Sequence, residues 1–139
     1  MAKESGLGFT TLSVDDDSGS LQDIRNDVPN FQFALPRGVQ DVTGIDVFAF
    51  ERLLLLADMN MTLNGVFNDA ANKSHDVFSS VPTYNSGRQV NIAHSGQSLG
   101  ITPAIEMIAT DYALTRGAGG ELTWTVPMAL SNGLVPTWT

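Results

Sequence analysis

The chain has 139 residues, the length of one ordinary domain, and we expect a single domain over residues 1–139. It contains no cysteine, which excludes disulfide bonds, thiolate catalysis and cysteine-based zinc sites. Fifteen Asp and Glu against seven Lys and Arg give a formal net charge of −8. This charge keeps a protein soluble, and it favours repulsion of nucleic acid over binding to it.

Neither a membrane span nor a signal peptide is indicated. The longest apolar run, residues 53–57, is far shorter than the roughly 20 residues that a spanning helix needs. Residues 1–6 place no apolar stretch behind Lys3. We therefore expect synthesis in a cytoplasm and no contact with a membrane.

Strand patterns dominate the first third of the chain. Residues 9–14 and 21–25 are predicted strands on either side of a turn at 15–19, which contains three aspartates, a serine and a glycine. Residues 30–34 form a short predicted strand with two phenylalanines on one side. The leucine-rich segment 46–56 fits either a helical turn or a buried strand, and its periodicity does not decide between them.

The middle of the chain predicts one strand followed by one helix. Residues 59–67 alternate between a mostly apolar and a mostly polar side, which is typical of a half-buried antiparallel strand. Asp69 can cap a short helix that runs to Phe78, and Pro82 would prevent its continuation.

The last third predicts a hairpin. Residues 88–92 alternate like a strand, and residues 105–115 are apolar on both sides, which favours a central strand covered on both faces. Residues 121–128 alternate again, after a glycine-rich turn at 116–120. We expect 105–115 and 121–128 to pair, giving a mainly β fold.

Several segments show no periodicity, namely residues 1–7, 35–45, 83–87, 93–104 and 129–139. Long irregular stretches such as 35–45 and 129–139 are unusual in a small compact domain. They suit arms that become ordered on assembly, although they can also pack on their own domain. If 129–139 is such an arm, its deletion stops polymerisation and leaves a folded monomer.

One motif matches a catalytic pattern. Residues 96–100 read Gly-x-Ser-x-Gly, the nucleophile elbow of α/β-hydrolases, with Ser98 in the nucleophile position. The elbow needs a following helix and a downstream histidine, but Pro103 follows closely and both histidines, His75 and His94, lie upstream. We therefore predict a loop at 96–100 and no catalytic residue.

Metal and cofactor sites are not indicated either. His75 and His94 lack neighbouring ligands at the spacings that metal sites use. Counted from Asp15 as an EF-hand loop, the sixth and twelfth positions are Ser20 and Asn26 in place of glycine and glutamate. The acidic stretch is thus predicted to be a solvated turn, and no phosphate-binding loop or basic patch is present.

Residues 63–78 resemble a known family. A strand there ends in the sequence Gly-Val-Phe-Asn-Asp and passes into a short predicted helix. This arrangement resembles the major tail (tail tube) proteins of siphoviruses, particularly those of actinobacterial phages. The likeness is weakest between about residues 79 and 103, and it extends in matching order to residues 1–8, 36–44, 110–116 and 120–124.

The resemblance implies an antiparallel β-sandwich or barrel with one flanking helix. It implies six-membered rings of identical subunits that stack into a hollow tube around a tape-measure protein, with tail terminator and distal tail proteins at the ends. Double-stranded DNA would pass through the tube without specific binding. The protein would be located in the virion, as a structural component with no enzymatic activity and no cofactor.

Two groups of residues become candidates on this basis. A repulsive inner wall would let DNA slide, so we expect some acids to face the channel, from the set Asp15, Asp16, Asp17, Asp58, Glu106, Asp111 and Glu121. The irregular segments 1–7, 35–45 and 129–139 would be arms or an inter-ring loop. Their candidate contacts with other subunits are Pro36, Arg37, Val39, Val42, Leu134, Val135 and Trp138.

Other classes of protein remain open at this point. A different virion component, such as a head–tail joining protein, a tail terminator or a capsid decoration protein, is also small and rich in β-structure. A monomeric β-sandwich that binds sugar or peptide has the same composition, and a hydrolase using Ser98 is the third alternative. The appearance of the concentrated protein in the electron microscope discriminates among them.

Overall fold

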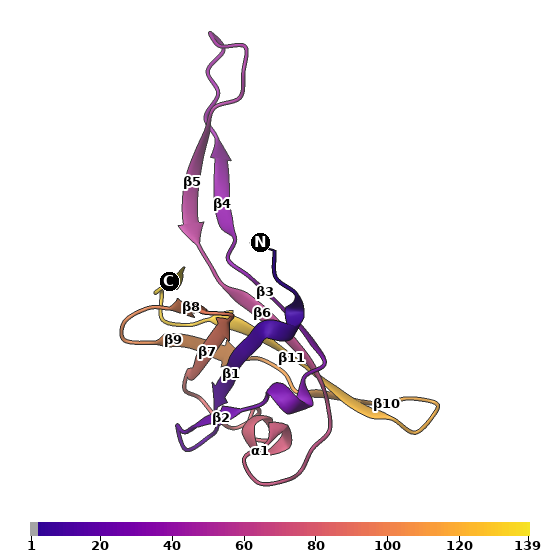
Figure 1. Cartoon of the computed structure of the whole chain (residues 1–139). Coiled ribbons are helices and arrows are strands. Elements are labelled where there is room, and N and C mark those ends of the chain that lie inside the picture. The colour runs from indigo at the N-terminus through magenta and orange to yellow at the C-terminus, as the bar shows by residue number, and fades with distance from the viewer. Residues whose placement is uncertain (1–2) are drawn as a thin grey trace.

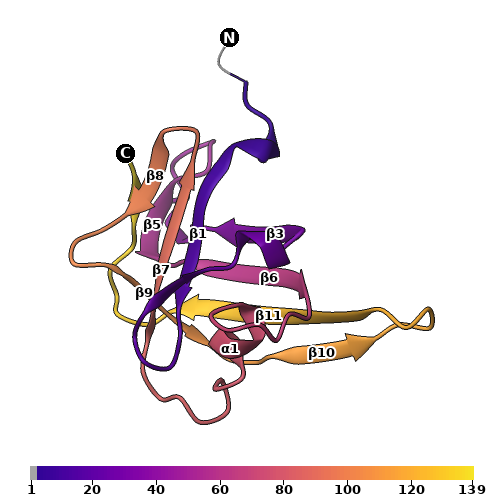
Figure 2. The ribbon, with the colours of Figure 1, turned by 60° about the horizontal axis from the view of Figure 1, so that its bottom comes forward.

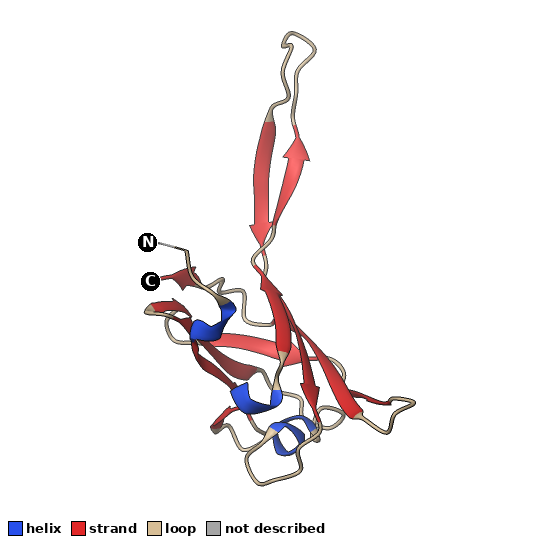
Figure 3. Ribbon diagram, turned by 45° about the vertical axis from the view of Figure 1, so that its right-hand side comes forward, coloured by secondary structure: helices blue, strands red, loops and turns tan. Residues whose placement is uncertain are grey.

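The computed structural model describes residues 3–139, so the first two residues of the expected 1–7 arm lie outside it. The described residues form twelve strands, one short α-helix and two 3₁₀ turns, and all strand pairs are antiparallel. The predicted fold class, an antiparallel β-sandwich with one short flanking helix, is confirmed (Figures 1 and 3). Within 3–139, no helix has the length and apolar character required to span a bilayer.

The strands, in chain order, are β1 (Phe9–Asp15), β2 (Leu21–Asp23), β3 (Asn30–Ala34), β4 (Arg37–Asp41), β5 (Arg52–Ala57), β6 (Asn60–Val66), β7 (Arg88–His94), β8 (Gln97–Gly100), β9 (Ile105–Ala109), β10 (Ala113–Arg116), β11 (Leu122–Leu130) and β12 (Thr137–Trp138). The helix and the two 3₁₀ turns are α1 (Ser74–Phe78), η1 (Gly6–Gly8) and η2 (Arg25–Asp27). The strand predicted at 30–34 is thus confirmed, and the strand predicted at 21–25 ends two residues early, where η2 begins.

The strands form two layers that strand β9 connects. One layer contains β2, β1, β7, β8 and β12, and the other contains β3, β6, β11 and β10 in that order. Strand β9 pairs with β7 of the first layer and with β11 of the second. Figure 2 shows the strands of the two layers crossing one another. The apolar core fills the space between them.

The core comes from the alternation predicted along the strands. On β6 and β11, the buried residues follow every second position, at Met61 and Leu63 and at Trp124, Val126 and Met128. On β1 and β7 the same period buries four further aliphatic side chains, those of Leu12, Val14, Val90 and Ile92. Each layer therefore turns one apolar face inward and one face outward.

The predicted central strand at 105–115 is wrong. It is two strands, β9 and β10, which pair with opposite ends of β11 on the same edge. Ile105 and Met107 are buried, but Ile108 is 41% exposed and every residue of β10 is exposed. Apolar residues on both sides of 105–115 had indicated a strand buried on both faces, but the outward-facing apolar side chains, such as that of Ile108, are exposed in this chain.

The predicted helix from Asp69 is also shorter than expected. It begins at Ser74 because Asn72 has a positive φ of 63°, which interrupts helical geometry. Its N-terminal cap comes from a distant residue, since the buried Asp27 carboxylate accepts the Ser74 N–H at 3.0 Å and the Asn68 side-chain amide at 2.9 Å. The helix then packs Phe78 against the core indole, Trp124, at 5.3 Å between ring centroids.

Gly65 permits the closest contact in the core. A Cβ atom at this position would lie 2.2 Å from the Trp124 ring and 2.6 Å from the Asp27 carbonyl oxygen. The indole is fixed there because its N–H donates to the Val66 carbonyl at 2.9 Å.

We expect Gly65→Ala to destabilise the fold by about 2–3 kcal/mol, because neither the indole nor the backbone can move away freely. Urea unfolding measures this change. Gly100→Ala is the matched control on another strand, where no atom lies within 4 Å of the added Cβ, and its effect should stay within roughly 0.5 kcal/mol. Equal stability of both variants would contradict the steric argument.

The two longest predicted arms, residues 35–45 and 129–139, are ordered. Residues 35–45 contain strand β4, which pairs with β5 in a two-stranded hairpin that projects from the body (Figures 1 and 3). The ambiguous segment 46–56 is therefore a loop followed by a strand. Residues 129–139 complete β11 and then add β12 to β8, with Pro136 buried, so this segment packs on its own domain. Its deletion would damage the fold, contrary to the expectation of an intact monomer.

Candidate assembly interface

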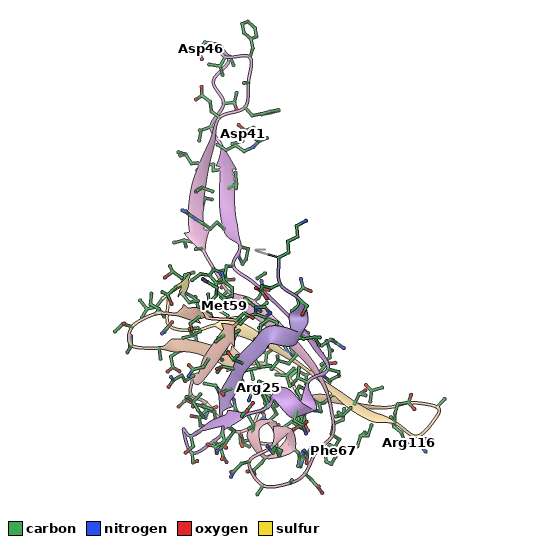
Figure 4. All side chains as sticks on the ribbon, viewed as in Figure 1. Arg25, Asp41, Asp46, Met59, Phe67 and Arg116 are labelled. Atoms are coloured by element: carbon green, nitrogen blue, oxygen red, sulfur yellow. The ribbon has the colours of Figure 1, made fainter. Side chains whose placement is uncertain are left out.

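The hairpin arm, residues 36–58, carries nine of the seventeen large apolar side chains that are exposed in the described chain. Figure 4 shows it extending away from the body, with Asp41 and Asp46 near its far end. Nine large apolar side chains are exposed along it, namely Val39, Val42, Ile45, Phe48, Phe50, Leu53, Leu54, Leu55 and Leu56. Soluble monomers rarely expose so much contiguous apolar surface, which typically marks an interaction site.

The strand register distributes these side chains over both faces of the arm. Val39 lies opposite Leu54, and the neighbouring pair of Gln40 and Leu53 points to the other side. A ribbon with one face in solvent would alternate apolar and polar residues, but here each face has a leucine. An isolated two-stranded hairpin is only marginally stable in water. Both faces of the arm are therefore apolar and uncovered in the single chain.

The base of the arm is fixed by backbone and arginine contacts. The Asp58 N–H donates to the Pro36 carbonyl at 2.9 Å. The register shifts between Arg37 and Val39, and the Arg37 guanidinium donates to the Leu55 carbonyl at 3.1 Å and 3.3 Å beside this irregularity. Arg37 thus has a local structural role in addition to being exposed.

The tip of the arm is ordered by short-range polar contacts. The Asp41 carboxylate accepts the Thr43 N–H at 2.9 Å, and this contact and the Thr43 hydroxyl lower the pKa of Asp41. The Thr43 hydroxyl oxygen in turn accepts the Glu51 N–H at 2.8 Å. Beyond these contacts, Ile45 and Phe48 are fully exposed, with relative exposures of 108% and 107%. The tip presents apolar side chains on a defined backbone.

The C-terminal candidates lie on the body. Leu134 is 38% exposed, Val135 is half-buried, and Trp138 is 46% exposed on β12. The Trp138 ring lies 5.8 Å from Phe33 and ends a row of aromatic side chains. Figure 1 places the C-terminus on the side of the body from which the arm projects. The structure thus gathers four of the seven contact candidates, Pro36, Arg37, Val39 and Val42, on the arm, and it places the other three on the body, in the C-terminal segment.

Two of the seven candidate acids are buried in the monomer. Asp15 is 8% exposed, and one of its carboxylate oxygens accepts the Gln89 N–H at 3.0 Å. Asp16 is 7% exposed and accepts the Ser18 and Ser20 N–H groups, each at 3.0 Å. Burial opposes ionisation of Asp16, but donation from the Ser18 hydroxyl, from these N–H groups and from the Gln22 side-chain amide outweighs it and lowers the pKa of Asp16. A turn follows β1 as predicted, but the prediction that the acidic stretch is solvated is wrong for these two carboxylates, which are buried and bond backbone N–H groups.

The remaining acids lie in two separate places. Asp17 is exposed in the β1–β2 turn, and Glu106 lies opposite Gln89 on the outer side of the first layer, where burial and Asp15 raise its pKa. The other three, Asp58, Asp111 and Glu121, are exposed just before strands β6, β10 and β11 of the second layer. The seven acids therefore do not share one wall.

The structure places no nucleophile elbow at Ser98. Residues 96–100, predicted to be a loop, form the turn and second strand of the β7–β8 hairpin, with Ser95 and Gly96 at φ values of 46° and 86°. Ser98 lies exposed on β8, and strand β9 follows where the elbow would need a helix.

The two histidines lie in separate hydrogen-bonded settings. The His75 ring bonds the Tyr112 hydroxyl at 3.1 Å, and the His94 ring bonds the Ser5 carbonyl at 2.7 Å. Over residues 3–139, no group of three or more His, Asp or Glu side chains is arranged to hold a metal ion.

Comparisons with known proteins give structural matches alone, since no family model and no curated protein matches the sequence. One match is a chain in the tail of an empty gene transfer agent particle solved with C6 symmetry. It has a TM-score of 0.73 and 17% sequence identity, over 99% of both chains. A chain in the virion of a native gene transfer agent particle matches with a TM-score of 0.65 and 18% identity, over 97% of this chain and 99% of that one. Over nearly its whole length, this protein therefore shares the fold of chains from gene transfer agent particles, one of them a chain of the tail.

Proposed function

We propose that this protein is the structural subunit of a phage tail tube, in which rings of six copies stack into a conduit for DNA. The observation that carries the proposal is the hairpin arm, which is apolar on both faces and uncovered in the single chain. The full-length likeness to a chain of a C6-symmetric tail supports the same reading. The protein would be a non-enzymatic component of the virion, made in the host cytoplasm.

In this proposal the arm inserts between neighbouring subunits. One face of the arm would pack on a subunit of its own ring and the other on the next ring, so that both leucine-bearing faces are buried. Residues near the C-terminus, such as Trp138, would contribute to the same interface. The finer assignment is to the major tail proteins of siphoviruses, particularly those of actinobacterial phages. The further partners would be a tape-measure protein, a tail terminator and distal tail proteins.

Within a ring, the sheet edges offer a second contact. Strands β3 and β10 are the two edges of the second layer, each with one partner strand among the described residues. An edge strand presents unpaired backbone N–H and C=O groups that a strand of another chain can complete. Two different edges on one subunit give head-to-tail contacts, which close into rings when the rotation allows.

The net charge suits a conduit for a polyanion. Six copies at −8 each carry a formal charge of −48, and a basic lumen would retain DNA through its phosphates. Because Asp15 and Asp16 are buried, we limit the channel-facing candidates to the exposed or half-buried acids, Asp17, Asp58, Glu106, Asp111 and Glu121.

Negative-stain electron microscopy of the concentrated, purified protein tests the proposal. Long hollow tubes of uniform width are expected, and their cross-section should show six-fold symmetry. Single rings would instead indicate a head–tail joining protein or a tail terminator. Monomers that stay dispersed at all concentrations and bind a sugar or peptide saturably would indicate a binding module and refute the proposal.

A further inference from the structure

The outward face of the second layer contains no charged residue. On the four strands β3, β6, β11 and β10, the register places thirteen residues on it, namely Asn30, Gln32, Ala34, Asn60, Thr62, Asn64, Val66, Ala113, Thr115, Thr123, Thr125, Pro127 and Ala129. Next to Ala129 the face continues onto Ile108 of the connecting strand β9, and Glu106, on the same side of β9, marks where the charged face of the first layer begins. Charged residues make up 16% of the chain and normally concentrate on exposed surface. Solubility alone would favour charged residues on an exposed sheet face, so their absence from this one indicates another constraint.

The polar groups on this face are short and partly paired with one another. The Asn64 side-chain amide donates to the Asn30 side-chain oxygen at 2.8 Å, and the Thr125 hydroxyl donates to the Asn64 oxygen at 2.9 Å. These contacts cross three strands and occupy donors that could otherwise bond a phosphate. The face is consequently smooth, wettable and poor in free donors.

The outward face of the first layer is different. Asp23 lies opposite Ser13 there, and Glu106 lies opposite Gln89. Packed sheets are separated by about 10 Å, so these acids lie on the far side of the core from the outward face of the second layer. Of the five remaining channel candidates, Glu106 and Asp17 of the β1–β2 turn thus belong to the first layer, which leaves Asp58, Asp111 and Glu121 for a channel lined by the second layer.

Charges flank the uncharged face without entering it. Asp58, Asp111 and Glu121 are exposed immediately before the strands β6, β10 and β11 that form this face. Acids at the strand ends would repel a polyanion at the two ends of the sheet and leave its middle neutral.

We propose that the uncharged face of the second layer lines the channel and is the surface along which double-stranded DNA slides. The inference rests on the proposed tail-tube function and identifies which face of the subunit meets the DNA. A Lys or Arg on this wall would form phosphate contacts and retain the DNA, whereas a dense row of acids would oppose its entry. An uncharged wall of short, mutually bonded side chains does neither.

Single cysteines test this assignment cleanly, because the chain has no cysteine of its own. Thr62→Cys places a thiol at an exposed position of the uncharged face, and Ser98→Cys is the matched control, exposed on the outward face of the first layer. Each variant is labelled as a monomer and as tubes, with a small maleimide and with a maleimide coupled to a carrier protein too large to enter the channel.

In tubes, we expect Thr62→Cys to keep its reaction with the small maleimide and to lose its reaction with the carrier. In tubes, Ser98→Cys should react with the small maleimide and should not selectively lose its reaction with the carrier-coupled maleimide. Thr125→Cys, on the same face as Thr62, gives the same readout if Thr62→Cys does not assemble.

Three results would overturn the inference while leaving the tail-tube function intact. Carrier labelling of Thr62→Cys in tubes at the monomer rate would place this face outside the tube. Protection of the thiol from both reagents would place it in a contact between subunits. Selective protection of Ser98→Cys in place of Thr62→Cys would make the first layer the wall. If the unmodified protein forms no tubes at all, the proposed function and this inference fail together.

Discussion

Replacing Ile45, Phe48 and Phe50 together with serine is expected to abolish tube assembly while leaving the monomer folded. These side chains are 108%, 107% and 71% exposed, so their removal takes nothing from the core of the single chain. Burying each of them against a neighbour would contribute about 1.5–3 kcal/mol. A combined loss of at least ~4 kcal/mol corresponds to a weakening of subunit association by about a thousandfold.

Sedimentation and electron microscopy measure the assembly of this triple variant, and thermal unfolding of the dilute protein measures the fold. Leu21→Ser is the control, because Leu21 is a 39% exposed apolar residue on β2, outside the arm. We expect the control to form tubes normally. Tubes from the triple variant at the wild-type critical concentration would show that the tip of the arm does not mediate assembly.

Arg88→Met is expected to destabilise or unfold the monomer itself. Arg88 is 2% exposed, and one of its terminal nitrogens donates to the carbonyls of Asp15 at 2.8 Å and Val77 at 2.9 Å. The other donates to the Ser80 hydroxyl at 3.0 Å, and the guanidinium lies 4.7 Å from the centre of the Tyr84 ring. One side chain thus joins β1, helix α1 and the segment that follows the helix.

Methionine fills a similar volume but donates no hydrogen bond, so the Asp15 carbonyl loses this partner and the Val77 carbonyl keeps only the long contact from the Ser80 hydroxyl, at 3.5 Å. An unsatisfied buried group costs about 1–3 kcal/mol, and we expect a total loss of about 3–5 kcal/mol in the free energy of unfolding. Denaturant unfolding measures it. Arg88→Lys keeps the charge without the planar fork and should lose an intermediate amount.

Arg25→Met is the matched control for Arg88→Met. Arg25 pairs with Asp23 at 2.9 Å, but the two side chains are 44% and 50% exposed. Such exposed ion pairs contribute roughly 0–1 kcal/mol. Similar losses of stability in the two arginine variants would show that the buried contacts of Arg88 are not the cause.

The strands of the core could be predicted from sequence because their signal is local. A two-residue period in 59–67 and 121–128 places alternate side chains on opposite faces, whatever the rest of the chain does. Strand β3 was predicted at its observed bounds, and the hairpin turn at 116–120 followed from its glycines.

The arm, the helix cap and the buried arginine were predicted less well, because their structure depends on residues that are distant in the sequence. Residues 46–56 gave no period because the arm carries apolar side chains on both of its faces. The cap on Ser74 comes from Asp27, 47 residues away, and Arg88 bonds the carbonyl of Asp15, 73 residues away. No local pattern in the sequence marks either residue.

The sequence by itself determined the β character of the chain, its acidity and the absence of cysteine. It did not determine which acidic side chains are buried or on which sheet face each one lies, because this depends on which strands are neighbours in the fold. Only the tertiary structure buried Asp15 and Asp16 and separated the other acids into two places. Likewise, the uncharged face exists only once β3, β6, β11 and β10 lie side by side, since antiparallel pairing brings together residues that are far apart in the chain.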